Sequence, residues 1–215
     1  PYQNALPPEG RELIKNISQL AGRVLRLTND LLDASRIEEG RFGYGFESAD
    51  IVAFVKKILG ESVALARQYG VQVFFESPPK DTYAISFDPA RISTVLSNLI
   101  DNAIRYNTEH GKVTVSISEI PGKPFVKITV TDTGIGVPQE ETARIFKKLE
   151  RGSNAVRIEP NGTGLGLYIS RNIVRRHGGS MGFESIVGRG SSFWFTLPLD
   201  SSLIPQKEAA TQETL

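Results

Sequence analysis

Two asparagines stand four residues apart in the segment LSNLIDNAIRYN, which spans residues 96–107. In a helix, side chains four residues apart lie one above the other, so Asn98 and Asn102 form a polar stripe that Arg105 and Tyr106 continue. A carboxamide oxygen is a suitable Mg²⁺ ligand, its NH₂ group can donate to phosphate, and a guanidinium neutralises phosphate charge. The Tyr106 ring offers a flat surface to a base. Taken alone, however, the stripe is more simply a solvated helix face.

A second candidate is DTGIGVP at residues 132–138, which follows an alternating apolar strand. The carboxylate of Asp132, at the end of that strand, could accept a hydrogen bond from an exocyclic amine such as adenine N6. Gly134 and Gly136 would let the backbone approach a ligand closely. An ordinary Asp-Gly turn is the simple alternative. Asp-Thr-Gly is also typical of aspartic proteases, but these need two such carboxylates. The chain has one copy, so a protease would have to be a symmetric dimer, and the helix-rich remainder argues against it.

The third candidate is GTGLGL at residues 162–167, where three glycines lead directly into a helical pattern. Free backbone N–H groups and the partial positive charge at a helix N-terminus favour an anion such as phosphate. Leu165 and Leu167 would anchor the helix. The spacing is neither that of a Walker A loop nor that of the dinucleotide fingerprint.

The composition is that of an ordinary globular protein, with 40% hydrophobic and 23% charged residues. A net charge of +1 gives no indication of nucleic-acid binding. No apolar run approaches the roughly 18–20 residues that span a bilayer, and no segment has the pattern of a signal peptide. The absence of cysteine excludes disulfides and thiolate metal sites, which leaves a hard cation held by oxygen ligands as an option.

The elements that must position these residues form an alternating series. The patterns predict helices at 51–69, 89–106 and 165–177, the first two capped by Asp50 and Asp88. They predict strands at 43–47, 71–76, 83–88, 112–120 and 125–132, and a final strand pair between 179 and 199. A polar stretch at about 147–163 has no periodicity and is predicted to be a mobile loop. The fold class is therefore α+β, a sandwich of a mixed β-sheet with helices on one face.

The first segment of the chain predicts one long helix, begun by Pro7, Pro8 and Glu9 and ended at Gly40. Its apolar residues recur at spacings of four and three, close to the heptad period: Leu13, Ile17, Leu20, Val24, Leu27 and Leu31. This narrow seam favours packing against partner helices. The alternative is an amphipathic helix that lies on its own domain.

Taken together, the order and spacing of the three motifs closely resemble the catalytic region of bacterial sensor histidine kinases, members of the GHKL ATPase superfamily. NLIDNAIRYN resembles the N box, DTGIGVP the G1 box, RIFKKLERG the F box and GTGLGLYIS the G2 box. GRGSSFWFTLPL resembles the last strand pair of the family. DLLDASRIEEGRF is similar to the end of the second helix of the dimerisation and phosphoacceptor domain. The resemblance covers about residues 9–199.

This resemblance implies a Bergerat-type fold that binds ATP and Mg²⁺ between the N-box helix and a lid at about residues 137–163. Asn102 would ligate Mg²⁺, Asn98 would contact phosphate or the metal shell, and Asp132 would bind adenine N6. The residues implied in catalysis are Asn98, Asn102 and Arg105. The other implied nucleotide contacts are Tyr106, Gly134, Gly136, Phe146, Arg151, Thr163, Gly164, Leu165, Gly166 and Leu167.

The implied reaction is transfer of the γ-phosphoryl group of ATP to a histidine, for relay to an aspartate on the receiver domain of a response regulator. The implied domains are residues 1–41 as the second helix of the dimerisation domain, 42–199 as the catalytic domain and 200–215 as a polar tail or linker. The first helix of the bundle, which carries the phosphoacceptor histidine in the family, is not in this chain. It and a homodimer partner would dock on the 13–31 seam. Use of ATP implies a cytoplasmic location, with attachment to a membrane upstream left open.

Two positions bear on this interpretation. Leu149 stands where the F box usually has a second aromatic residue, which puts docking of the lid in question. His177 ends the helix that starts near Gly164, about 20 Å from its phosphate-binding end, so it is not expected to be the phosphoacceptor. Instead, Arg175, Arg176 and His177 are interpreted as cations that complement the helix dipole, with Gly178 as the cap.

Other branches of the superfamily are the main alternatives. In the chaperone and DNA-repair ATPases, the N-box helix carries a catalytic Glu that activates water, and Asn98 stands at that position here. Serine kinases that act on anti-sigma-factor antagonists share the four boxes but lack the long heptad helix. A pseudokinase that binds nucleotide only to control a partner is a third alternative, although the intact asparagine pair and glycines argue against it.

Overall fold

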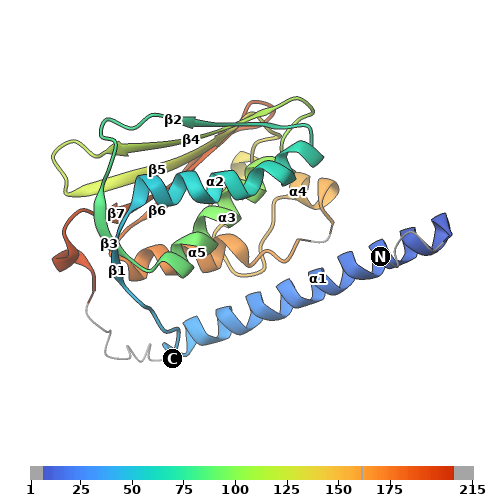
Figure 1. The fold of residues 1–215 in the computed structure, drawn as a ribbon, viewed down its shortest axis with the longest axis horizontal. Helices are drawn as coiled ribbons and strands as arrows, with labels where there is room; N and C mark the ends of the chain where they lie inside the picture. The colour runs from blue at the N-terminus through green and yellow to red at the C-terminus, as the bar shows by residue number, and fades with distance from the viewer. Residues whose placement is uncertain (1–6, 161, 206–215) are drawn as a thin grey trace.

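The computed structural model describes residues 7–160 and 162–205, which form a layered α+β domain preceded by one long helix (Figure 1). One layer is a five-stranded sheet in the order β2-β4-β5-β7-β6. Its strands are β2 (Gln72–Glu76), β4 (Lys112–Glu119), β5 (Phe125–Asp132), β6 (Met181–Ile186) and β7 (Gly190–Pro198). Only β2 and β4 pair in parallel, so the sheet is mixed, as the sequence predicts.

The second layer consists of three helices that pack on one face of this sheet (Figure 1). They are α2 (Ile51–Gln68), α3 (Pro89–Arg105) and α5 (Gly166–Arg176). The predicted N-caps are confirmed: the Asp50 carboxylate accepts from the Val52 N–H at 3.1 Å, and the Asp88 carboxylate accepts from the Arg91 N–H at 3.0 Å. The hydrophobic core lies between the two layers and includes Ile92, Leu99, Ile128, Ile169 and Phe195, all almost completely buried.

A separate two-stranded sheet pairs β1 (Glu47–Asp50) with β3 (Ala84–Phe87). The strand predicted at 43–47 is therefore wrong, since β1 begins where that prediction ends. The preceding aromatic residues Phe42, Tyr44 and Phe46 do not alternate in a sheet. Tyr44 and Phe46 instead pack on the ring of His177, with ring centres 5.7 and 4.8 Å away.

The loop predicted at 147–163 contains a short helix, α4 (Ser153–Ile158), which follows a turn of 3-10 helix, η2 (Gln139–Glu141). Periodicity could not reveal α4, because a distant side chain helps to hold it. Both carboxylate oxygens of Glu141 accept from the Ser153 N–H, at 3.1 and 2.9 Å. The segment predicted to be a lid therefore contains local secondary structure.

The first helix, α1 (Pro8–Glu38), begins and ends as the sequence predicts, and Gly40 has a left-handed φ of 65°. Its apolar seam faces solvent: Leu13 is 61% exposed, Val24 61% and Leu31 46%. The last turns of α1 lie on the helix layer, where Ala34 is buried and Ile37 packs on the core. In Figure 1, α1 extends away from the sheet and passes below α5. Among the described residues, α1 is therefore docked on its own domain at its C-terminal end, while the side chains of the predicted seam are exposed.

The predicted polar tail begins with ordered structure. Asp200 caps a short 3-10 helix, η3 (Ser201–Leu203), by accepting from the Ser202 N–H at 2.8 Å. The Pro205 carbonyl accepts from Arg176 at 3.1 Å, which ties this segment to the end of α5. The rest of the predicted tail, residues 206–215, lies outside the described residues. Within the described ranges, no helix is both long and apolar enough to cross a membrane.

Candidate functional site

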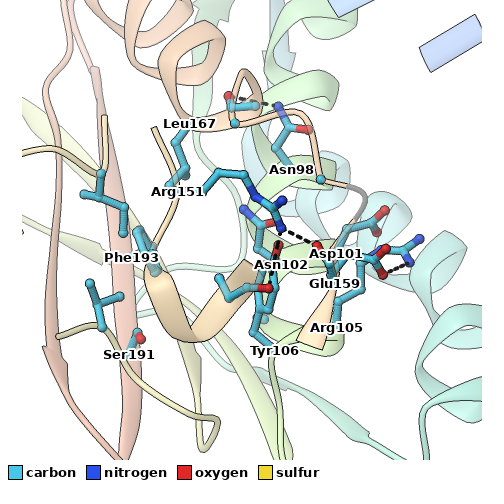
Figure 2. Close-up of a pocket in the computed structure, with 18 of the residues that line it drawn as sticks. Asn98, Asp101, Asn102, Arg105, Tyr106, Arg151, Glu159, Leu167, Ser191 and Phe193 are labelled. Carbon is cyan, nitrogen blue, oxygen red and sulfur yellow. Dashed lines mark hydrogen bonds and ion pairs between the residues drawn. The ribbon is translucent and has the colours of Figure 1, made fainter. Parts of the chain in front are cut away.

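A cavity of about 290 Å³ lies between α3, the loop after β5, the lid and the start of α5. Residues from all three sequence motifs line it, together with Arg26 and Asp30 of α1. Figure 2 shows Asn98 and Asn102 on the α3 side of the cavity. Its volume is at the lower end of the range of small-molecule sites, and the guanidinium of Arg151 occupies part of the space between the lid and α3.

The predicted stripe on α3 forms one wall of this cavity, so the solvated-face alternative is wrong. The Asn98 NH₂ group donates to the Gly166 carbonyl at 3.2 Å and to the Ser170 hydroxyl at 3.1 Å. These bonds join α3 to the glycine-rich start of α5. They also fix the orientation of the Asn98 amide, which makes its carbonyl oxygen the atom available to a ligand.

Arg105 and Tyr106 lie at the C-terminal end of this wall. The Arg105 guanidinium donates to the Tyr69 hydroxyl at 2.8 Å and lies 3.7 Å from a carboxylate oxygen of Glu159 in the lid. The Tyr106 carbonyl accepts from the Ile135 N–H at 3.0 Å, which holds the loop after β5 against α3. A Cβ at position 134 would collide with that same carbonyl, so Gly134 is required by this close approach.

Asp132 ends β5 and is almost completely buried, with 8% of its surface exposed. Its Oδ1 atom accepts from the Gly134 N–H at 2.8 Å and from the Ser191 N–H at 3.2 Å. Burial raises the pKa of Asp132 to about 6, although these two backbone hydrogen bonds act in the opposite direction. Since both bonds end on Oδ1, Oδ2 is the oxygen that an amino group in the cavity would meet.

The glycine-rich segment lies where α5 begins. Gly164 has a left-handed φ of 69°, and a Cβ there would come within 2.9 Å of the Leu149 backbone. Leu165 is completely buried, and it precedes Gly166 at the first position of the helix. The helix N-terminus has no side-chain cap, which leaves backbone donors for an anion.

Arg151 holds the lid together. Its guanidinium donates to the backbone carbonyls of Glu159, Pro160 and Ala155, the last two at 3.1 and 3.5 Å. Leu149, at the second F-box position, is 60% exposed with a left-handed φ of 62°. It therefore contributes little apolar packing to the lid, and its backbone N–H instead donates to the Gly164 carbonyl at 3.1 Å.

Most of the sequence-predicted site residues meet in this one cavity. Those that line it are Asn98, Asn102, Arg105, Tyr106, Asp132, Gly136, Arg151, Thr163, Gly164, Gly166 and Leu167. Three others do not line it: Gly134 and Leu165 shape the backbone, and Phe146 packs on Phe183 with ring centres 5.7 Å apart.

Several residues of the cavity wall were not predicted. Asp101 could have been found from its spacing, since it follows Asn98 by one helical turn. Burial raises its pKa, against the attraction of Arg105 and Arg26. Asn154 donates to the Gly136 carbonyl at 2.7 Å, and this hydrogen bond joins the lid to the loop after β5. Arg26 and Asp30 come from α1, and no local pattern places them here.

The interpretation of His177 as a cation of the helix end is wrong. Its side chain is completely buried, and burial lowers its pKa. Its Nε2 atom accepts from the Asp88 N–H at 3.0 Å, so Nδ1 carries the proton and donates to the Ile173 carbonyl at 2.8 Å. His177 is therefore a neutral histidine that joins the end of α5 to the cap of α3. The predicted cap at Gly178 is confirmed by its left-handed φ of 76°.

No cluster of three or more histidine, aspartate and glutamate side chains that could hold a metal ion occurs in the part of the chain that the structure describes. The oxygen donors in the cavity are instead the side-chain amides of Asn98 and Asn102 and carboxylates such as that of Asp101. This donor set fits a hard cation that takes most of its ligands from a bound molecule and from water, as Mg²⁺ does with phosphates.

Comparisons with known proteins identify relatives that are ATPases and histidine kinases. The family model for histidine kinase-, DNA gyrase B- and HSP90-like ATPases matches residues 87–201. The chain is 35% identical over 176 residues to the sensor histidine kinase WalK of Bacillus subtilis, which covers 82% of this chain and 28% of that protein. The chain therefore spans less than a third of the length of this relative.

Two solved structures are also similar. Full-length ShkA in complex with AMPPNP has a TM-score of 0.75 and 27% identity, over 90% of this chain and 39% of that one. The histidine kinase ThkA in complex with the response regulator protein TrrA has a TM-score of 0.71 and shares the fold at 22% identity, over 92% of this chain and 53% of that one. The cavity, the order of its motifs and these likenesses lead to one conclusion: the chain belongs to the family of histidine kinase-, DNA gyrase B- and HSP90-like ATPases, as a catalytic and ATP-binding region of the sensor histidine kinase type.

Proposed function

We propose that this chain binds Mg·ATP in the cavity and transfers the γ-phosphoryl group to a histidine on a helix outside the chain. The observation that carries the proposal is the meeting of three motifs, far apart in the sequence, around one cavity. The stripe on α3 supplies amide oxygens and a guanidinium, the loop after β5 supplies a buried carboxylate, and the start of α5 supplies backbone donors. Phosphoryl transfer asks a protein mainly for positioning and charge neutralisation, and these groups meet that demand.

The two ends of the cavity differ in chemistry, which favours one orientation of the bound nucleotide. Adenine is proposed to lie at Asp132, where its N6 amine would donate to Oδ2. Ile135 and Val137, which follow Asp132 in the same loop, line the cavity together with Phe193 and offer apolar contact to the base. The phosphates would then lie toward Asn98 and the N-terminus of α5, where the helix dipole favours negative charge. Arg105 and Arg151 would neutralise phosphate charge.

Mg²⁺ is proposed to bind the side-chain oxygen of Asn102, with Asn98 in the metal shell or on a phosphate. When bound, the ion would neutralise charge that develops on the phosphates. The chain's own residues hold the nucleotide in place and close the lid over it, which excludes water. At position 98 an amide cannot act as a general base toward water, whereas a glutamate can. Transfer to a protein acceptor is therefore favoured over hydrolysis.

The partners outside the chain follow from the same proposal. The exposed seam of α1, from Leu13 to Leu31, is proposed to pack against the missing phosphoacceptor helix and a second copy of the chain. Residues 1–41 would then belong to the dimerisation domain, 42–199 to the catalytic domain and 200–215 to a tail or linker. The complex of ThkA with TrrA supports a response regulator as the final acceptor. Use of ATP supports a cytoplasmic location.

Calorimetry with a non-hydrolysable ATP analogue tests the proposal, with and without Mg²⁺. We expect Mg²⁺-dependent binding that Asn102→Ala weakens, because the variant removes a ligand oxygen from the cavity wall. Asn172→Ala is the matched control, since its side chain bonds to the Tyr168 carbonyl within α5 and does not line the cavity. Equal affinities of Asn102→Ala and the unmodified chain in the presence of Mg²⁺ would refute the metal assignment.

Phosphoryl transfer itself requires a second experiment. The chain is mixed with γ-labelled ATP and a separately produced first bundle helix that carries the missing histidine. Acid-labile label should appear on that helix. Tight ATP binding without any transfer would instead support the pseudokinase alternative.

A further inference from the structure

The last turns of α1 reach the rim of the cavity. Arg26 and Asp30 line it, and two further contacts follow along the helix. The Glu38 carboxylate forms an ion pair with Lys148 of the lid at 2.8 Å and accepts from the Tyr168 hydroxyl at 3.5 Å. Each of these contacts joins α1 to the lid or to the first turn of α5, the parts of the domain that would hold phosphate.

A chain of hydrogen bonds connects Asp30 to the glycine-rich segment. The Leu165 N–H donates to the Thr163 hydroxyl oxygen at 3.2 Å, and the Thr163 hydroxyl donates to Asp30 Oδ2 at 3.1 Å. Both donors at the entry to α5 are therefore occupied in this arrangement. Their final acceptor is a carboxylate of α1, more than 130 residues away in the sequence.

A phosphate at this helix N-terminus needs the same donors. It cannot receive the Thr163 hydroxyl while Asp30 holds it, and it would bring negative charge beside a carboxylate. Arg26, one turn earlier on α1, offsets part of that repulsion, and Asp33, one turn later, adds to the negative charge. Burial also raises the pKa of Asp30, which indicates that its charge is poorly solvated here.

We infer that Asp30 is an autoinhibitory latch, which holds the glycine-rich segment in an arrangement that excludes the nucleotide phosphates. ATP and Asp30 compete for the hydroxyl donor of Thr163, whose oxygen in turn accepts from the Leu165 N–H. Because such coupling is reciprocal, ATP binding releases this anchor of α1, and docking of α1 weakens ATP binding. The latch rests on the proposed function, since it presupposes that the cavity binds ATP.

The affinity for a non-hydrolysable ATP analogue tests the latch in the whole chain. Asp30→Ala removes the acceptor and the charge and should bind the analogue roughly three- to tenfold more tightly, the range expected for loss of a partly exposed charge-assisted hydrogen bond. Asp30→Asn keeps an acceptor but not the charge and should give a smaller gain. Asp33→Ala is the matched control, because it also removes one carboxylate from α1, one turn beyond Asp30.

The outcomes separate the latch from the proposed function. Absence of binding by the unmodified chain would overturn the proposed function, and the latch with it. Binding by the unmodified chain with equal or weaker binding by Asp30→Ala would overturn the latch alone. An equal gain in Asp33→Ala would also overturn it, because the effect would then be one of general charge.

A distance measurement tests the release of α1. The chain has no cysteine, so Glu12→Cys in α1 and Glu61→Cys in α2 place two spin labels at exposed positions without background. The distance distribution should change or broaden when the ATP analogue binds, and Asp30→Ala should show part of that change without nucleotide. Identical distributions with and without the analogue, at saturating concentration, would contradict the release.

Discussion

Replacing Asp132 with asparagine should stabilise the domain and at the same time weaken ATP binding. The carboxylate is buried, and its pKa is raised from the usual 3.8 to about 6. That shift corresponds to about 3 kcal/mol by which burial disfavours the ionised form in the folded state. An asparagine oxygen at the position of Oδ1 can keep the hydrogen bonds from Gly134 and Ser191, while the charge is removed.

The stability difference should depend on pH in a definite direction. The folded chain holds a proton on Asp132 below about pH 6, whereas the unfolded chain loses it above about pH 4. The unmodified chain therefore loses stability through this group as the pH rises from 4 to 6. Asp132→Asn lacks that loss, so its free energy of unfolding should exceed that of the unmodified chain by up to about 3 kcal/mol at pH 7 and by little near pH 4.

Urea unfolding of both proteins at several pH values measures this difference directly. Other titrating groups are common to both proteins and cancel. A difference that stays constant between pH 4 and pH 7 would contradict a raised pKa at Asp132.

The same variant should bind ATP more weakly by roughly 1–3 kcal/mol, because an NH₂ donor would replace Oδ2 and face the donor amine of adenine. Competition between ATP and GTP provides the second readout. Equal binding of both nucleotides by the unmodified chain would refute the role of Asp132 in base selection.

Four further predictions concern the lid, His177 and Gly134. Amide exchange across residues 137–163 should be fast without nucleotide and slow with it, because contacts between side chains and backbone, such as those of Arg151, hold the lid; uniform protection would contradict the lid assignment. With γ-labelled ATP, the chain alone should acquire no acid-labile label on His177, since that side chain is completely buried; label that His177→Ala abolishes would refute this. The same His177→Ala variant should lower the free energy of unfolding by about 2–4 kcal/mol, because it leaves a cavity and an unpaired Asp88 N–H, and urea unfolding would measure the loss. Gly134→Ala should weaken ATP binding at least tenfold by calorimetry, because its Cβ would collide with the Tyr106 carbonyl and displace the loop that holds Asp132; unchanged affinity would show that the loop is not set by this contact.

The sequence by itself determined most of the elements, and most of the site residues that it predicted line the cavity. Asp50 and Asp88 cap their helices through hydrogen bonds to residues two and three positions away. Such local interactions can be predicted from the sequence without knowledge of the fold. The strands predicted at 112–120 and 125–132 are present as β4 and β5, because their period of two selects one buried face. Asn98 and Asn102 share a face for a similar reason, since helical spacing alone decides it.

Only the tertiary structure decided which surfaces meet. From its place at the end of a helix, the sequence predicted that His177 is a cation. Burial against Tyr44, Phe46 and the cap of α3 instead makes its neutral form the stable one. The short helix α4 depends on Glu141, twelve residues before its first turn, and so has no local signature. Asp30 meets Thr163 across more than half of the chain. Contacts of this kind depend on how whole elements pack, and packing is set by the summed burial of many side chains rather than by any one spacing.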